Sequence, residues 1–216
     1  MQIEVGPEKR SLYVHHGLLI ENAEFFRTAL KQEWFEGQQR TVTLREDNYE
    51  MVIIYAQWLY TGQFFMSARN AEGQPLYLPL IKSYVLGEKL LDPTFQDLVL
   101  NTIAALSREE HGPELTRYFP GDEAYAILYK GTTSSSPARR LMVHMIIGQG
   151  DASWVAKGSD RRWDAPEELK DDLLAELMEK GDLLEPDDKR YQFLEKGIPC
   201  AYHMHGKGTP CSGPSK

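Results

Sequence analysis

The sequence has only two cysteines, Cys200 and Cys211, and both lie close to its end. A chain of 216 residues with so few cysteines has no disulfide framework, so its stability has to come from packed apolar side chains. Apolar residues make up 42% of the chain and aromatic residues 11%. This content is enough for a packed core and excludes a disordered chain.

Basic residues are fewer than acidic ones. The chain has 24 Lys and Arg against 32 Asp and Glu, which gives a formal net charge of −8. Binding to a phosphate backbone depends on clustered Lys and Arg. We therefore expect no nucleic acid among the direct partners.

Long apolar runs are missing as well. None approaches the roughly 20 residues that a helix needs to cross a bilayer. Residues 1–5 also lack the basic and apolar regions of a signal peptide. We expect an intracellular protein, cytoplasmic or nuclear, that has no membrane partner.

The motifs of common enzyme classes are absent, including the Gly-x-Ser-x-Gly elbow, the His-Glu-x-x-His helix, the phosphate loop and the kinase set. Residues 148–153 form part of a dinucleotide fingerprint, with Ser153 in place of the third glycine. That fingerprint needs a strand on each side, whereas Arg139 and Arg140 open a segment with a helical pattern. We interpret it as a helix end and expect neither catalysis nor a cofactor.

Three short alternating segments predict a small β-sheet. Residues 3–5 and 12–14 flank a turn at Gly6, which is the pattern of a β-hairpin, and residues 40–44 form a third strand candidate. A two-stranded hairpin is marginal in water. It therefore has to pack on the helices that follow.

Helical periodicity begins after the hairpin. An apolar stripe over residues 25–30 predicts a helix with Asn22 as its N-cap, and the chain should leave this helix by Gly37. After the third strand comes a polar break in which Asp47 or Asn48 can cap another helix. The expected order is therefore strand, strand, helix, strand, helix.

The next helices have clear boundaries. The helix after the polar break ends at Gly62, a second spans residues 76–91, and the Asp92-Pro93 pair separates it from a third over residues 95–106. The charged segment 108–113 ends in Gly-Pro and marks a domain boundary. We divide the chain into an N-terminal unit of residues 1–107, a helical extension of residues 108–195 and a polar tail of residues 196–216.

The extension contains three apolar or helical segments. Residues 122–130 and 141–147 have helical patterns, and a short aromatic turn is expected around Trp154. A last helix opens after Asp164 with a proline in its first turn, and should end at Gly181. Its predicted apolar stripe consists of Leu169, Leu173, Leu174, Leu177 and Met178.

Several short motifs occur in an order that is specific although each is weak alone. They are Tyr13-Val14-His15, Leu18-Leu19, Phe25-Phe26-Arg27-Thr28-Ala29-Leu30, Val42-Thr43-Leu44, Trp58-Leu59-Tyr60-Thr61-Gly62 and Tyr84-Val85-Leu86-Gly87-Glu88-Lys89-Leu90. This order resembles the BTB/POZ family. Three later motifs resemble the helical extension of its fungal members: Ser136-Pro137-Ala138-Arg139-Arg140-Leu141, Pro166-Glu167-Glu168-Leu169 and Tyr202-His203-Met204-His205.

The resemblance implies an α+β fold, in which a small sheet is capped by helical hairpins and followed by a mainly helical extension. It also implies a role in protein-protein contact without catalysis. Many family members associate with another BTB chain, and a subset binds a cullin scaffold as substrate adaptors of ubiquitin ligases. Strand-exchanged dimers of the family carry a further strand and helix before the hairpin. Because residues 1–6 are all that precede it here, we do not expect that kind of dimer.

The resemblance also points to a candidate interaction site. Cullin-binding members often carry an apolar-x-Glu element after the Phe-Phe helix, and Trp34, Phe35 and Glu36 occupy that place here. In one interpretation Trp34 fills a partner's pocket and Glu36 meets a basic group. In the other, Trp34 or Phe35 folds back onto the protein's own core.

The end of the chain holds a candidate zinc site made of Cys200, His203, His205 and Cys211. Zinc accepts two Cys and two His, and His203 and His205 would lie on one side of an extended segment. The spacing is not that of a standard zinc finger. An ordinary polar tail is the alternative.

Two other polar segments have ordinary structural interpretations. His15 and His16 are adjacent at a strand end and point to opposite faces, so they do not share a metal. We expect His15 to be a core histidine with a polar partner. Residues 132–136 carry only Thr and Ser, and form a loop whose hydroxyls are able to accept phosphate.

Overall fold

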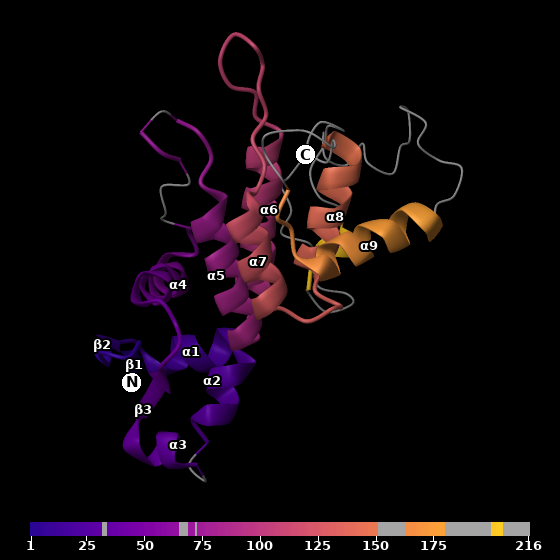
Figure 1. Cartoon of the computed structure of the whole chain (residues 1–216). Helices are drawn as coiled ribbons and strands as arrows, with labels where there is room; N and C mark the ends of the chain where they lie inside the picture. Colours follow the sequence, from indigo (N-terminus) through magenta and orange to yellow (C-terminus); the bar gives the residue numbers. More distant parts are fainter. Residues whose placement is uncertain (32–33, 65–68, 72, 151–162, 180–199, 205–216) are drawn as a thin grey trace.

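The chain folds into a small three-stranded sheet near its N-terminus, followed by a mostly helical region (Figure 1). This computed structural model describes residues 1–31, 34–64, 69–71, 73–150, 163–179 and 200–204. The arrangement is α+β, as predicted. Within the described part of the chain, no helix is long and apolar enough to cross a membrane.

The sheet is mixed and has the strand order β2-β1-β3. Strand β1 (Gln2–Val5) pairs antiparallel with β2 (Arg10–Tyr13) and parallel with β3 (Thr41–Leu44). The three predicted strands are confirmed within a residue or two. Alternation puts one face of the sheet into the core, where four side chains are at most 2% exposed: Ile3, Val5, Val42 and Leu44.

The chain between the hairpin and β3 differs from the prediction. It forms three short helices, α1 (His16–Asn22), α2 (Glu24–Ala29) and α3 (Phe35–Gln39), in place of one helix ending near Gly37. Asn22 is not an N-cap, because it is the last residue of α1 and its Nδ2 donates to the carbonyl of Leu18 at 2.8 Å. The extended Ala23 between α1 and α2 redirects the chain, and burial of apolar residues on both helices sets that direction.

Helix α4 (Tyr49–Thr61) has the predicted caps. Asn48 is its N-cap, and its Oδ1 accepts the backbone N–H groups of Glu50 at 2.8 Å and Met51 at 3.3 Å. Gly62 ends the helix with φ +67, a left-handed conformation that glycine adopts without strain. Local chemistry alone fixes both ends of this helix.

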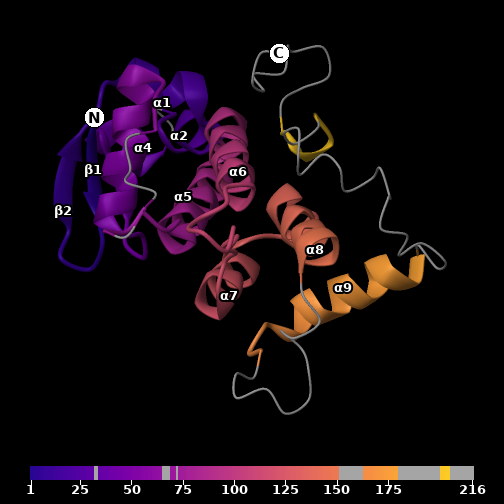
Figure 2. The ribbon, with the colours of Figure 1, turned by 90° about the horizontal axis from the view of Figure 1, so that it is seen from above.

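Helix α5 (Tyr77–Leu90) lies in the middle of the molecule and contacts α2, α4, α6 and α7 (Figure 2). It crosses α6 (Pro93–Ser107) closely, because a Cβ at Gly87 would lie 2.9 Å from Cδ1 of Phe95. Most of α5 is buried as a result. Asp92-Pro93 separates α5 from α6, as the sequence predicts.

The described residues after α6 form the helices α7 (Asp122–Gly131), α8 (Pro137–Gln149) and α9 (Glu167–Glu179) of the extension, and the short 3-10 turn η2 (Cys200–Tyr202) of the tail. The three helices confirm predicted segments. Helix α7 packs on α5, and α8 packs on α9 and η2. The predicted turn at Trp154 and helix end at Gly181 lie outside the described residues.

The predicted apolar stripe of α9 is wrong in one respect. Leu169 and Leu173 are buried, but the other three members are exposed: Leu174, Leu177 and Met178. Leu169 and Leu173 lie on the inner face of α9, which packs against α7 and α8. The described part of the chain offers no second surface that covers the remaining three.

Asp92 is a buried carboxylate between the two central helices. As the N-cap of α6, its Oδ1 accepts the backbone N–H of Phe95 at 3.0 Å, and its Oδ2 accepts the hydroxyl of Tyr55 at 2.8 Å. Its exposure is 0%. Burial raises the pKa of Asp92 from 3.8 to about 6, against the lowering effect of these hydrogen bonds.

The native protein should lose stability between about pH 4 and about pH 7. We predict that the Asp92→Asn variant does not show this loss. Because the folded protein holds the Asp92 proton more tightly than the unfolded chain, this group's contribution is fully present below its ordinary pKa. It is lost as pH rises through about 6. The loss amounts to about 3 kcal/mol, at about 1.4 kcal/mol per pH unit. Urea unfolding at several pH values measures it.

The exposed Glu8 of the hairpin turn offers a matched control. The Glu8→Gln variant removes a carboxylate that caps no helix. Its free energy of unfolding should therefore depend on pH as that of the native protein does. Equal slopes for the native protein and Asp92→Asn would contradict the prediction.

Candidate interaction site

Trp34 is an exposed aromatic residue at the beginning of α3. It is the N-cap of that helix and has an extended backbone. Its N–H donates to the carbonyl of Lys31 at 3.0 Å, and its own carbonyl accepts the N–H of Gln38 at 3.2 Å. The side chain is 55% exposed. The indole therefore lies outside the core, where a partner is able to reach it.

Phe35 and Glu36 follow in the first turn of α3. The side chain of Phe35 lies outside the described part of the structure, so its contacts are not assigned. Glu36 is half-buried. Trp34 and Glu36 thus both lie at the beginning of α3, the exposed aromatic residue two positions before the carboxylate.

The position of this turn is fixed by a close backbone approach. A Cβ at Gly37 would lie 2.2 Å from the carbonyl oxygen of Lys31, so no larger residue fits there without a shift of the backbone. Arg40, with φ 51, ends α3 and leads directly into β3. Figure 1 shows α3 beside β3, at the end of the molecule away from the extension.

The zinc candidates are only partly described. Cys200 is exposed at the start of η2, and Nε2 of His203 lies 3.1 Å from Oδ1 of Asn101. His205 and Cys211 lie outside the described residues. Among the residues that are described, no group of three His, Cys, Asp or Glu is placed to hold a metal.

His15 is not a core residue, contrary to the prediction. It is exposed at the N-cap of α1, because β2 ends at Tyr13 and the chain turns outward. Its Nδ1 lies 2.6 Å from the hydroxyl of Tyr60, which also accepts the His15 backbone N–H at 3.0 Å. The expected polar partner is present, but at the surface.

The partial dinucleotide fingerprint is a helix end, as predicted. Gly148 lies inside α8 and Gly150 is its C-cap. The segment before it is helical, so the strand that a phosphate-binding turn requires is missing on that side. Residues 151–153 lie outside the described part of the chain.

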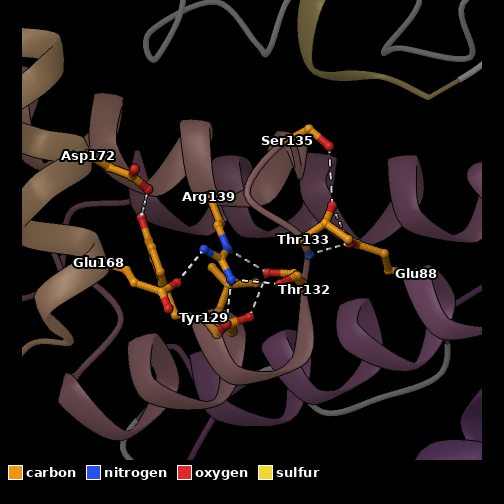
Figure 3. Close-up of polar contacts among 9 residues, drawn as sticks. Glu88, Tyr129, Thr132, Thr133, Ser135, Arg139, Glu168 and Asp172 are labelled. Carbon is orange, nitrogen blue, oxygen red and sulfur yellow. Dashed lines mark hydrogen bonds and ion pairs between the residues drawn. The ribbon is translucent and has the colours of Figure 1, made fainter.

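A buried arginine joins the helices of the extension (Figure 3). Arg139, 6% exposed, donates from Nε to Oγ1 of Thr132 at 3.0 Å and from Nη2 to the carbonyls of Tyr129 and Thr132 at 2.5 and 2.6 Å. Its Nη1 pairs with Glu168 of α9 at 2.6 Å. One guanidinium therefore links α7, the α7–α8 loop, α8 and α9.

Three further hydrogen bonds extend this network in two directions. The hydroxyl of Tyr129 donates to Oδ2 of Asp172 on α9 at 2.8 Å. On the other side, Glu88 of α5 accepts the Thr133 N–H at 3.0 Å and the Ser136 hydroxyl at 2.7 Å. We call this network the polar clasp, and its residues are Glu88, Tyr129, Thr132, Thr133, Ser136, Arg139, Glu168 and Asp172.

The polar clasp was not predicted, although the sequence contains a signal for it. Arg139 lies in the first turn of a helix, where a positive charge opposes the helix dipole. Its neighbours Ala138, Leu141 and Met142 are fully buried. A charge at such a position needs several partners, and those partners come from segments that only the folded chain brings together.

Comparison with protein-family models and with curated proteins finds no match to this chain. The interpretation of the site therefore depends on its geometry and on the motifs themselves.

We predict that Arg139→Ala lowers the free energy of unfolding by about 3 kcal/mol, because it leaves buried carbonyls without donors and removes a buried ion-pair partner. Arg139→Lys should recover only part of the loss, since an ammonium lacks the fork that reaches several acceptors. Urea denaturation measures both effects.

The neighbouring Arg140 gives the control. Its side chain is exposed and lies over the Tyr202 ring at 5.2 Å, so Arg140→Ala should cost about 1 kcal/mol or less. If both alanine variants lost the same free energy of unfolding, the prediction that the contacts of Arg139 stabilise the fold more than those of Arg140 would be wrong.

Proposed function

We propose that this protein is a non-enzymatic interaction module, an adaptor that binds a partner protein through Trp34, Phe35 and Glu36. The partner that the BTB/POZ resemblance suggests is a cullin scaffold of a ubiquitin ligase. The observation that carries the proposal is the 55% exposure of Trp34, two residues before the half-buried Glu36. Aromatic anchors of this kind dominate the energy of many interfaces.

The test is a titration of the full chain with the N-terminal domain of a cullin. Trp34→Ala and Glu36→Lys should each weaken binding about tenfold or more, because they remove the anchor and reverse the charge beside it. Isothermal titration calorimetry reports both affinities.

The loop between α6 and α7 lies far from α3 in Figure 1. Its residues Glu114 and Leu115 give matched controls. Leu115 is 63% exposed, so Leu115→Ala and Glu114→Lys should leave the affinity unchanged. A native protein that does not bind the cullin domain rejects this partner. Binding that survives both site variants rejects the site.

One observation favours a second candidate function, a self-associating module without a ligase connection. The described sheet has two unpaired edges, β2 and β3, and Tyr13 on β2 is 72% exposed. Open edges of this kind are surfaces on which strands of another chain pair.

Light scattering separates the two candidates. A homo-oligomer that persists on dilution and does not bind the cullin domain supports the second function. A monomer that binds the cullin domain supports the first.

A further inference from the structure

Helix α9 carries apolar residues on two different faces. Leu169 and Leu173 are 0% and 8% exposed, and they face the helices α7 and α8 that hold α9 in place. On the other side, Leu174 is 56% exposed, Leu177 42% and Met178 73%. The chain therefore packs one apolar face of α9 and leaves the second in solvent.

The exposed residues line up with acidic ones. Glu167, Asp171, Leu174 and Met178 are spaced at i, i+4, i+7 and i+11, so they form one row along the helix. Turning 100° per residue places this row opposite the buried Leu169 and Leu173. We call the row, with Leu177 beside it, the outer face of α9. It is about 17 Å long, or three turns.

Figures 1 and 2 show where the outer face lies. In both views α9 leaves α8 and runs away from the central helices, so its last turns project from the described part of the molecule. Leu174, Leu177 and Met178 all belong to those last turns. A helix of another protein is able to lie alongside these turns.

Helix α9 is strongly negative, and not all of its acidic side chains have a partner among the described residues. The helix has six acidic residues and one lysine. Glu168 and Asp172 are used by the polar clasp, and Glu176 contacts Nε2 of His144 at 2.7 Å. Asp171, which lies one turn before Leu174 in the same row, makes no ion pair with any described residue.

We propose that the outer face of α9 binds a basic amphipathic helix of a partner protein. Leucine and methionine supply the apolar contact, and methionine adapts to partners of different shape. Asp171, which lies in the same row, selects lysine or arginine beside it. A second copy of this chain fits poorly, because it brings the same acidic helix and a net charge of −8. The inference is independent of the Trp34 site.

The test uses two synthetic amphipathic peptides of about 18 residues, with leucine at helical spacing and either lysine or glutamate at all other positions. Fluorescence anisotropy measures their binding to the full chain. The lysine peptide should bind at least about tenfold more tightly than the glutamate peptide. Leu174→Ala with Met178→Ala should weaken that binding about tenfold, and Asp171→Lys should weaken it most at low salt.

Two control variants make the outcome decisive. Leu115→Ala removes an exposed leucine elsewhere, and Trp34→Ala removes the other candidate site. Both should bind the lysine peptide normally. If the double variant also binds normally, the attraction is mere net charge and the proposal fails. It also fails if the double variant lowers the melting temperature, since the chain itself then covers the face, or if it abolishes a dimer, since a second copy then does.

Discussion

The burial of α5 is the constraint on which the rest of the structure depends. This helix contacts α2, α4 and α6 of the N-terminal unit and α7 of the extension. Its side chains Leu80, Ile81, Tyr84 and Leu90 are completely buried. A helix that is apolar on nearly every side is stable only when all its neighbours are in place. The sheet, the helices of the N-terminal unit and the extension therefore share one apolar cluster.

The burial of α5 also explains where the polar groups of the interior lie. Asp92 begins the next helix while remaining inside the core, so it needs both the Phe95 N–H and the Tyr55 hydroxyl. Glu88, one turn earlier, reaches the loop that precedes α8. Both carboxylates lie near the C-terminal end of α5, where the chain has to turn and backbone groups are left without helical partners.

Elements with local signals could be predicted from the sequence, and elements fixed by distant contacts could not. Asn48 and Gly62 bracket α4 because a cap depends on residues within one turn. The break at Ala23 has no such signal, since it follows from burying Leu19 and Phe26 from two short helices at once. Alternation identified the strands, but not the parallel pairing of β1 with β3.

The candidate site and the polar clasp also combine features with a local sequence signal and features that depend on contacts between distant residues. Motif order drew attention to Trp34 and Glu36, but no periodicity reveals the close backbone approach between Lys31 and Gly37 that shapes this turn. Arg139 was visible only as part of a motif. Its function as the centre of the polar clasp depends on Thr132 and Glu168, which no local pattern connects to it.

The polar clasp has a consequence for what the extension offers to solvent. By drawing Glu168 and Asp172 inward, it fixes the rotation of α9 about its axis, and this rotation turns Asp171, Leu174 and Met178 outward. Figure 1 shows α9 far from α3, with the other helices between them, and one apolar cluster joins the N-terminal unit to the extension. An adaptor has to hold two proteins at once without a clash between them. The two faces that we propose as binding sites, one centred on an aromatic anchor and one on an acidic amphipathic helix, lie apart on one packed body, which is the arrangement that the proposed adaptor requires.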